Sequence, residues 1–258
     1  MSQKAAKFLD LKLNSSDRDS LLKELVLRLE KVQKTVIVTP NPEIILKARI
    51  DKDLLKALQS ANVALADGIG LVWALRFLAG KKVPRVAGRQ FAEDLLQLAN
   101  DKRLKVYLLG ASKIVNAKAQ DKIKSQYKNL KIEGRSGPRL DQKAKPVTLR
   151  DRESYYDTLK HIKAFNPDIL LVAFGAPKQE LWILDNKKKL NAKIIMAVGG
   201  TLDYISGKMK LPPAMFSKLG LEWLWRLGQD PARIFRIFNA VVIFPLYILG
   251  LKLSKANK

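Results

Sequence analysis

The sequence contains no cysteine and a single histidine, His161. The absence of cysteine excludes disulfides, thiolate metal sites and cysteine nucleophiles, and it fits a reducing compartment. One histidine without cysteine also excludes a structural zinc site. His161 lies in LKHIKAFNPD, a stretch typical of a surface helix, and nothing around it indicates a ligand or catalytic role. We therefore expect neither a bound metal nor a cofactor.

Acidic residues are scarce relative to basic ones: 24 Asp and Glu stand against 48 Lys and Arg, a net charge of +24. Such an excess attracts polyanions, whether nucleic acid, an anionic membrane surface or a phosphorylated substrate. The lysines are spread along helical segments and form no dense tract. A lysine-rich, well-solvated surface is therefore an equally simple interpretation, and charge alone does not choose among these classes.

Long apolar runs are also missing. The N-terminus, MSQKAAKFLDLKLN, lacks the apolar core of a secretory signal, so we expect a cytosolic protein. The most apolar segment, AVVIFPLYILGL at 240–251, has 12 residues and is interrupted by Pro245, whereas a bilayer-spanning helix needs about 20. We expect this segment to lie on a membrane surface and to be too short to cross it.

Short apolar runs rich in β-branched residues predict five buried strands, separated by helical patterns such as 42–59 and 89–100. Continuously apolar strands that alternate with helices indicate a mainly parallel sheet with helices on both faces, a Rossmann-like α/β fold. We divide the chain into an α/β body, 1–206, and a C-terminal helical appendage, 207–258. The predicted strands are 35–39, 63–66, 105–110, 168–175 and 192–200.

Each predicted strand ends in small and polar residues, where open parallel sheets bind their ligands. In VALADGIGLVWAL, Asp67 follows an apolar run and precedes Gly68. Burying an unpaired carboxylate is costly, so we expect Asp67 to lie at a strand tip and not in the core. The other tips carry TPNPE at 39–43, GAS at 110–112, GAPKQE at 175–180 and GGTLD at 199–203.

The appendage differs from the body in composition. It has nine Lys and Arg against two acids, together with tryptophans and phenylalanines. Asp230 and Pro231 are typical of the N-cap and first position of a helix. Basic and aromatic residues on one amphipathic helix predict binding to an anionic membrane surface, although a helix simply packed on the body is an alternative.

Several distinctive stretches occur in one order along the chain. They are TPNPE at 39–43, ADGIGLVWA at 66–74, PRVAGRQF at 84–91, LLG at 108–110, PDILLVAFGAPKQE at 167–180, VGGTLDYISG at 198–207 and LGLEWLWRLGQDPARIFR at 219–236. Over roughly residues 35–240 this combination resembles the WecG/TagA/CpsF family of bacterial glycosyltransferases. The P-K-Q-E and L-E-W-x-x-R elements are the most specific parts of the resemblance.

The resemblance implies transfer of a sugar, often N-acetylmannosamine, from a UDP-sugar donor to a polyprenyl-diphosphate-linked saccharide. The reaction would proceed with inversion and without an essential metal, on the cytoplasmic face of the cell membrane, in cell-surface polysaccharide synthesis. These implications agree with an α/β body that has no credible metal ligands and a basic, amphipathic appendage.

Candidate roles follow residue by residue. Asp67 matches the family's D-G aspartate and is the candidate base that takes the acceptor hydroxyl proton. By resemblance, Thr39, Asn41 and Gln179 would bind the donor sugar or its diphosphate, and Asp203 would bind nucleoside hydroxyls. Close backbone approach and positive charge suit Gly110, Gly199, Gly200 and Arg85 for the diphosphate. Arg226, Arg233 and Arg236 would bind the phosphates of the acceptor.

Alternatives remain for several of these residues and for the function. Asp67 could be a turn or cap residue, Asn41 a turn residue between prolines, and Gln179 a helix-start cap. The family's usual Arg-Ala-Pro element is Leu-Pro-Pro at 211–213 here, so a phosphate contact would fall to Lys208 or Lys210.

The chain could also be an inactive nucleotide-sugar-binding protein or a basic nucleic-acid-binding protein. No helix-turn-helix, RNP or zinc-finger pattern supports the second of these, and we expect no nucleic-acid partner. A homo-oligomer is compatible with the sequence, which fixes no stoichiometry.

Overall fold

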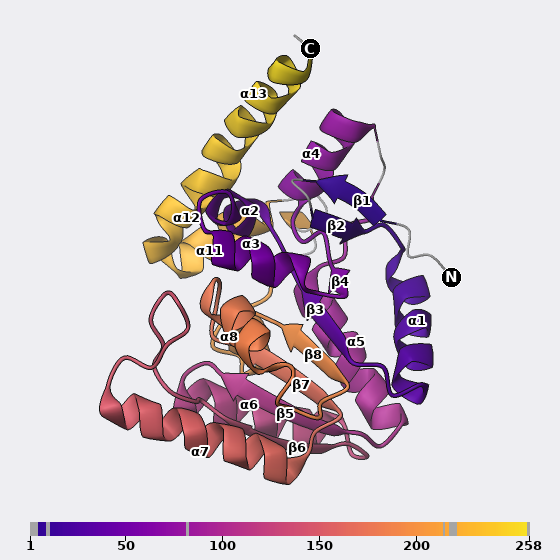
Figure 1. Ribbon diagram of the computed structural model, residues 1–258, viewed down its shortest axis with the longest axis vertical. Coiled ribbons are helices and arrows are strands. Elements are labelled where there is room, and N and C mark those ends of the chain that lie inside the picture. The colour runs from indigo at the N-terminus through magenta and orange to yellow at the C-terminus, as the bar shows by residue number, and fades with distance from the viewer. Residues whose placement is uncertain (1–4, 9–10, 81–82, 214, 217–220, 257–258) are drawn as a thin grey trace.

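The computed structural model describes residues 5–8, 11–80, 83–213, 215–216 and 221–256. Its centre is a six-stranded sheet in the order β4-β3-β8-β7-β5-β6, in which all pairs are parallel (Figure 1). The strands are β3 (Thr35–Val38), β4 (Val63–Ala64), β5 (Lys105–Gly110), β6 (Lys131–Arg135), β7 (Ile169–Ala173) and β8 (Ile194–Ala197). The predicted Rossmann-like α/β class is confirmed.

Helices cover both faces of this sheet because successive strand residues point to opposite sides. Leu170 and Val172 of β7 join one hydrophobic cluster, whereas Ile169 and Leu171 join the other. The first cluster contains buried residues of α2 (Pro42–Ala48), α3 (Lys52–Gln59), α4 (Ile69–Ala79), α7 (Leu149–Phe165) and α8 (Lys178–Asn186). The second cluster contains buried residues of α1 (Arg18–Glu30), α5 (Gly88–Asp101), α6 (Lys113–Gln126) and α9 (Thr201–Ile205).

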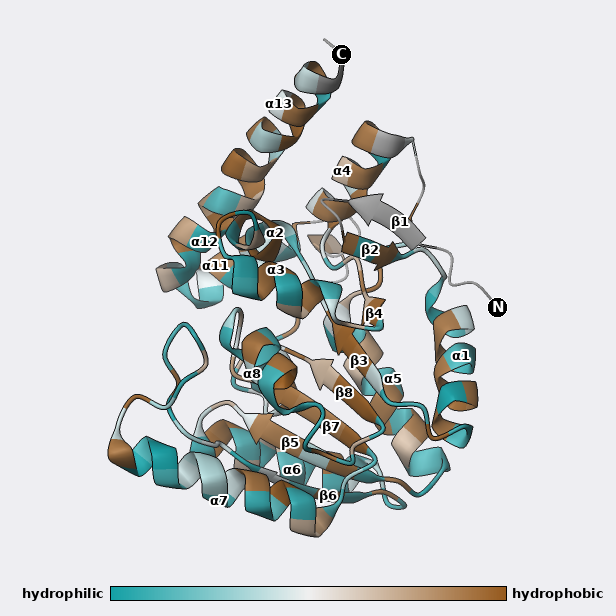
Figure 2. Cartoon of the chain, viewed as in Figure 1, coloured by the Kyte–Doolittle hydropathy of each residue, from teal (hydrophilic) through white to brown (hydrophobic). Residues whose placement is uncertain are grey.

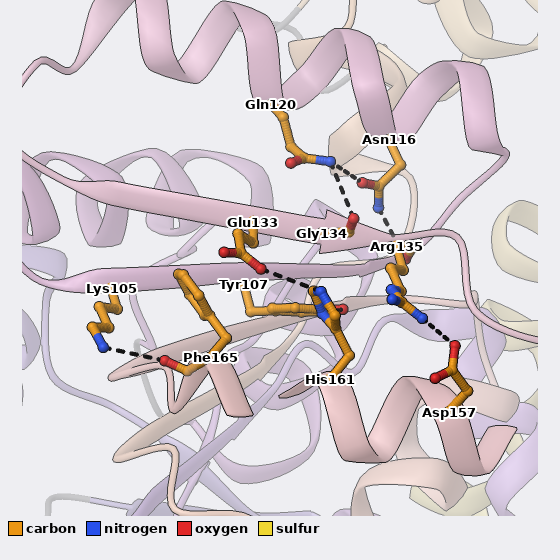
Figure 3. Close-up of polar contacts among 10 residues, drawn as sticks. All are labelled: Lys105, Tyr107, Asn116, Gln120, Glu133, Gly134, Arg135, Asp157, His161 and Phe165. Atoms are coloured by element: carbon orange, nitrogen blue, oxygen red, sulfur yellow. Dashed lines mark hydrogen bonds and ion pairs between the residues drawn. The ribbon is translucent and has the colours of Figure 1, made fainter. Parts of the chain in front are cut away.

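The edge strand β6 was not predicted. Its sequence, KIEGR, contains one buried apolar residue, Ile132. Polar contacts from α6 hold it in place instead: the Asn116 amide donates to the carbonyl of Arg135 at 3.2 Å, and the Gln120 amide donates to that of Gly134 at 3.3 Å (Figure 3). A strand held in this way carries no hydrophobic pattern for sequence analysis to detect.

His161 lies on α7 against the same edge of the sheet (Figure 3). Its Nδ1 is 3.0 Å from the Tyr107 hydroxyl, and its Nε2 is 3.4 Å from a carboxylate oxygen of Glu133. These contacts join α7 to β5 and β6. The single histidine therefore serves packing, in agreement with its prediction as a residue of a surface helix.

A short N-terminal hairpin was also not predicted. Strands β1 (Ala5–Phe8) and β2 (Leu11–Asn14) pair antiparallel. Leu11 and Leu13 of β2 are buried in the cluster that also holds α2 and α3. Four alternating residues, LKLN, are too few to separate a strand from a coil by periodicity.

The appendage, 207–258, contains α11 (Glu222–Gln229), which is followed by one helical rod. The rod consists of a 3₁₀ turn (Pro231–Arg233), α12 (Ile234–Phe238), a π-helical turn (Asn239–Ile243) and α13 (Phe244–Ala256). Phe244 and Ile248 are completely buried and belong to the same cluster as the sheet residues. The predicted helix start at Pro231 is confirmed.

The prediction that the C-terminal segment is too short to cross a membrane is wrong. The helix Pro231–Ser254 has 24 residues with a mean hydropathy of 2.0 in its most apolar window, which suffices by length and composition. Pro245 does not interrupt it, because Pro245 is the second residue of α13 and the missing N–H falls where the ladder is already interrupted by the π-helical turn.

Candidate active site

A cavity of about 770 Å³ opens at the carboxyl ends of the central strands. The loops after β3, β4, β7 and β8 form one side of it, and the appendage forms the other. All of the predicted site residues except Gly110 line this cavity: Thr39, Asn41, Asp67, Arg85, Gln179, Gly199, Gly200, Asp203, Arg226, Arg233 and Arg236. Segments far apart in the sequence thus converge where a parallel sheet binds its ligands.

Gly110 does not line the cavity and has a packing role. Its φ is +103°, and a Cβ there would lie 2.7 Å from the carbonyl carbon of Ala173. The ends of β5 and β7 therefore approach so closely that only glycine fits. The small residue that suggested phosphate approach is explained by contact between two strands.

Asp67 lies beyond the tip of β4, after the buried Leu65 and Ala66. Its own N–H donates to the carbonyl of Pro40 at 3.1 Å, which fixes the turn, and its carboxylate accepts a hydrogen bond from the backbone N–H of Gly88. The side chain is half-buried in the cavity wall. The carboxylate therefore faces the cavity, and the expectation that Asp67 lies at a strand tip is confirmed.

The charges around Asp67 come from both parts of the chain. Burial raises the pKa of the Asp67 carboxyl above its ordinary value, while Arg226 and Arg85 act in the opposite direction. Arg85 is in turn paired with Glu222 of α11, with Nη2 2.5 Å from Oε2. Glu222 also lines the cavity. Two acids and two arginines thus meet where the body and the appendage touch.

The three candidate arginines of the appendage have different surroundings. The Arg226 guanidinium lies over the ring of Tyr204, 5.5 Å from its centre. Arg233 pairs with Asp230 at 2.7 Å, within its own turn. Arg236 pairs with Glu43 of α2, with Nε 2.9 Å and 3.0 Å from the two carboxylate oxygens. Of the three, Arg226 acts on the charge of Asp67.

Thr39 and Asn41 follow β3 and shape the floor of the cavity. The Asn41 side chain accepts a hydrogen bond from the N–H of Ile44 at 3.0 Å and caps α2. Thr39 is buried, with its hydroxyl 3.4 Å from the carbonyl of Ala197. The structure thus gives Asn41 a capping role, whereas its predicted alternative was a turn role between prolines, and no acceptor for its side-chain amide N–H groups is found among the described residues.

Gln179 ties two strand tips together. Its Oε1 accepts hydrogen bonds from the backbone N–H of Gly175, at 3.2 Å, and of Gly199, at 3.0 Å. Since the N–H of Gly199 is engaged, a phosphate contact in this turn would fall to Gly200. The Gln179 amide donates to Glu180 Oε1 at 2.8 Å. The side chain therefore holds the cavity wall while itself lining the cavity.

Asp203 lies in α9 near the mouth of the cavity and pairs with Lys208 at 3.2 Å. Lys208 itself is largely exposed. Among the residues that the structure describes, no group of three or more His, Asp and Glu side chains is placed to share a metal ion.

The chain was compared with families of known proteins. A family model described as "Glycosyl transferase WecG/TagA/CpsF family" matches residues 6–258. The chain belongs to this family. It is therefore a glycosyltransferase, as the strand-tip motifs predicted.

Curated relatives of this glycosyltransferase carry the name N-acetylglucosaminyldiphosphoundecaprenol N-acetyl-beta-D-mannosaminyltransferase. The one from Bacillus subtilis (strain 168) is 35% identical over 223 residues, which is 86% of this chain and 81% of the relative. The one from Staphylococcus aureus (strain MRSA252) is 32% identical over 222 residues, covering 86% and 80% of the two chains.

Two cavity residues of the glycosyltransferase escaped the sequence analysis. Glu222 belongs to the L-E-W-x-x-R element, but an acid was not sought in a segment expected to bind phosphates. Tyr204 lines the cavity beneath Arg226, and its buried hydroxyl has no hydrogen-bond partner among the described residues. Tyr204 directly follows Asp203 in the sequence, and Glu222 lies four residues before Arg226 in the same motif.

Glu180 should make the stability of this glycosyltransferase depend on pH. Burial raises the pKa of its carboxyl from 4.5 to about 7, so ionisation opposes folding, and stability falls as pH rises between these values. The shift corresponds to a penalty on the order of 3 kcal/mol above pH 7. Glu180→Gln removes it and should melt several degrees higher than the wild type at pH 8.

The two melting temperatures should converge below pH about 4.5, where Glu180 is protonated in both the folded and the unfolded chain. Thermal melts of wild type and variant from pH 4 to pH 9 test this expectation. A constant difference between them over that whole range would show that Glu180 ionises normally.

Proposed function

We propose that the protein transfers N-acetylmannosamine from UDP-N-acetylmannosamine to N-acetylglucosamine linked to a polyprenyl diphosphate. The observation that supports this most directly is the cavity in which Asp67 of the body meets Arg85 and Arg226. The names of the relatives from Bacillus subtilis and Staphylococcus aureus supply the sugar and the acceptor of the proposal.

Asp67 is the base of the proposed inverting reaction. The acceptor hydroxyl oxygen attacks the anomeric carbon, its proton passes to the Asp67 carboxylate, and the bond from that carbon to the donor diphosphate breaks. A carboxylate is a weak base for a resting alcohol, but the hydroxyl becomes acidic as the new bond forms. The raised pKa of Asp67 makes it a better proton acceptor than an exposed aspartate.

Negative charge develops on the departing UDP, and Arg85 together with the N–H groups of the glycine turn at Gly200 is suited to meet it. Arg85 has unused hydrogen-bonding capacity, because its Nε is buried without a partner among the described residues. Its present partner, Glu222, would yield its place to a phosphate oxygen. The proposed reaction requires no metal, since guanidinium and backbone groups supply the positive charge.

The acceptor is a lipid, so the cavity must open near a membrane. Figure 1 shows α13 and α4 projecting at the same end of the molecule, and Figure 2 shows that both are largely apolar. One side of the C-terminal helix packs on the body through Phe244 and Ile248. We therefore propose that this helix lies along the cytoplasmic face of the membrane, as part of a peripheral appendage, and does not cross it.

The outward side of that helix carries an exposed apolar row at spacings of three and four residues, which places its members on one face. The row consists of Phe235, Phe238, Val242, Leu246, Leu249 and Leu253. Together with Ile69 and Trp73 of α4, it forms a surface suited to the acyl boundary of a bilayer, with Arg233, Arg236 and Lys252 placed to meet anionic headgroups.

The double variant Leu246→Ser, Leu249→Ser should bind vesicles containing phosphatidylglycerol at least tenfold more weakly, because two apolar side chains lose their burial in the bilayer. Its melting temperature should change little, since the two leucines are 61% and 46% exposed. Leu27→Ser on α1, also an exposed leucine, is the matched control. Vesicle flotation measures the binding, and equal binding by both variants would contradict the proposed orientation.

A direct assay tests the proposed reaction. The purified protein is incubated with a panel of UDP-sugars and a short-chain polyprenyl-diphosphate N-acetylglucosamine, and products are analysed by mass spectrometry. The expected product gains one N-acetylhexosamine from UDP-N-acetylmannosamine, with and without EDTA. Transfer from another UDP-sugar alone would change the donor assignment, and dependence on added metal would contradict the metal-free mechanism.

A further inference from the structure

Glu180 is a buried acid that the proposed reaction does not use. It is 1% exposed, lies on α8 directly after Gln179, and does not line the cavity. Its Oε1 accepts the hydrogen bond from the Gln179 amide, and its Oε2 is buried without a partner among the described residues. An acid in such a place costs stability, so its presence calls for a compensating role.

The Gln179 amide is hydrogen-bonded at both ends. Its oxygen spans the N–H groups of Gly175 and Gly199, which follow the neighbouring strands β7 and β8. Both glycines line the cavity, with φ of +76° and +53°. The amide nitrogen has one acceptor among the described residues, the carboxyl of Glu180. A flipped amide would turn its N–H groups toward the two glycine N–H groups, so the glycines select this orientation, and the Glu180 carboxyl holds the other end of the amide in place.

We propose that Glu180 is a positioning residue, which holds the Gln179 amide so that its oxygen joins the two glycine turns of the cavity wall. The donor diphosphate and sugar would meet this wall, so the kinetic part of the inference rests on the proposed function. The structural part does not rest on it, because that part concerns only how firmly the turns at Gly175 and Gly199 are held.

The protonation state of Glu180 is compatible with its hydrogen bond to Gln179. Burial raises the pKa of the Glu180 carboxyl to about 7, and the Gln179 hydrogen bond and Lys47 partly oppose that rise, while Glu43 adds to it. Glu43 and Lys47 form an ion pair at 2.8 Å on α2, next to the cavity. A carboxyl that is neutral or charged near neutral pH accepts the Gln179 hydrogen bond in either form.

The first test follows the amides of Gly175 and Gly199 by hydrogen exchange, which needs no enzymatic activity. Glu180→Met keeps the side-chain length but removes the acceptor, and it should accelerate exchange at both amides about five- to tenfold, as expected for one lost hydrogen bond. Glu180→Gln keeps an acceptor and should restore protection. Unchanged exchange in Glu180→Met would overturn the proposal.

Asn186 provides the matched control on the same helix. It is fully buried and donates to the Tyr155 hydroxyl at 2.7 Å and to the Trp182 carbonyl at 2.8 Å, away from the cavity. Asn186→Leu should lower the melting temperature without changing exchange at Gly175 and Gly199. If it accelerates them as much as Glu180→Met does, the effect is general destabilisation and the inference fails.

A double-mutant cycle tests whether Glu180 acts through Gln179. Gln179→Met should raise KM for the UDP-sugar about tenfold, and adding Glu180→Met to it should change little further, because the link is already broken. Additive effects of the two substitutions would overturn the proposal. If Glu180→Met does not fold, Glu180→Asp, whose carboxyl is one methylene too short to reach, replaces it in both tests with the same expected results.

The two proposals fail in different ways. Absence of transfer by the wild-type protein with every UDP-sugar would remove the proposed function, while the exchange measurements would still decide the role of Glu180. Normal transfer with unaltered glycine exchange in Glu180→Met would remove the positioning role alone.

Discussion

Replacing Asp67 by asparagine should lower kcat by about 10²- to 10⁴-fold, the usual contribution of a positioned general base. The asparagine keeps the shape of the side chain and can still accept the hydrogen bond from Gly88, but it cannot take the acceptor proton. Binding of UDP should change little. The melting temperature should stay the same or rise, because burial disfavours the charged carboxylate that the substitution removes.

The pH profile sharpens this prediction. The base must be ionised, so the rate of the wild type should rise with pH through the pKa of Asp67, which burial has moved above its ordinary value of about 3.9. That acidic limb should be missing from the residual activity of Asp67→Asn. Initial rates from pH 4 to pH 9 with saturating substrates measure both.

Asp51→Asn is the control for this substitution. Asp51 caps α3 outside the cavity through its bond to the N–H of Leu54, and asparagine is an equally good cap, so activity and melting should be unaffected. A fully active Asp67→Asn enzyme would leave Asp67 as a turn residue and would require another base.

Replacing Arg226 by methionine should lower kcat/KM for the lipid-diphosphate acceptor about a hundredfold. The reason is that a charge-assisted hydrogen bond to a phosphate contributes ~1.5–3 kcal/mol. The loss should also move the acidic limb of the pH profile to higher pH, since Arg226 is the charge that opposes the raised pKa of Asp67 most strongly. Steady-state kinetics over the same pH range measure both effects.

Arg226→Lys separates charge from shape in this experiment. Lysine keeps the positive charge but not the planar guanidinium that lies over Tyr204, so an intermediate loss is expected. Arg28→Met, which removes a surface arginine of α1 outside the cavity, is the control and should leave kinetics unchanged. Equal kinetics for Arg226→Met and wild type would exclude Arg226 from acceptor binding.

Much of the fold could be predicted because its central strands are apolar along their whole length. β3, β7 and β8 are buried on both faces, and apart from Thr35 at the start of β3 their residues are all apolar. β6 lies at an edge of the sheet, where polar contacts from α6 take the place of apolar side chains, whereas β2 buries Leu11 and Leu13 but is too short for its alternation to be recognised.

The site was predicted where one rule sufficed, namely that ligands meet the carboxyl ends of parallel strands. The rule located Asp67 and Gln179 without knowledge of their contacts. It could not anticipate Gly110, whose neighbour Ala173 belongs to another strand, nor the pairing of Arg85 with Glu222, which are 137 residues apart. Contacts of that kind depend on how elements meet in space, which composition and spacing do not encode.

The burial of Phe244 and Ile248 bears on how the C-terminal segment can be studied. A fragment ending near residue 206 would expose the apolar sites that these two side chains fill, and would be prone to misfold or aggregate. Inactivity of such a fragment would then reflect a damaged scaffold. Substitutions within the full-length chain avoid this damage, because they leave Phe244 and Ile248 in place.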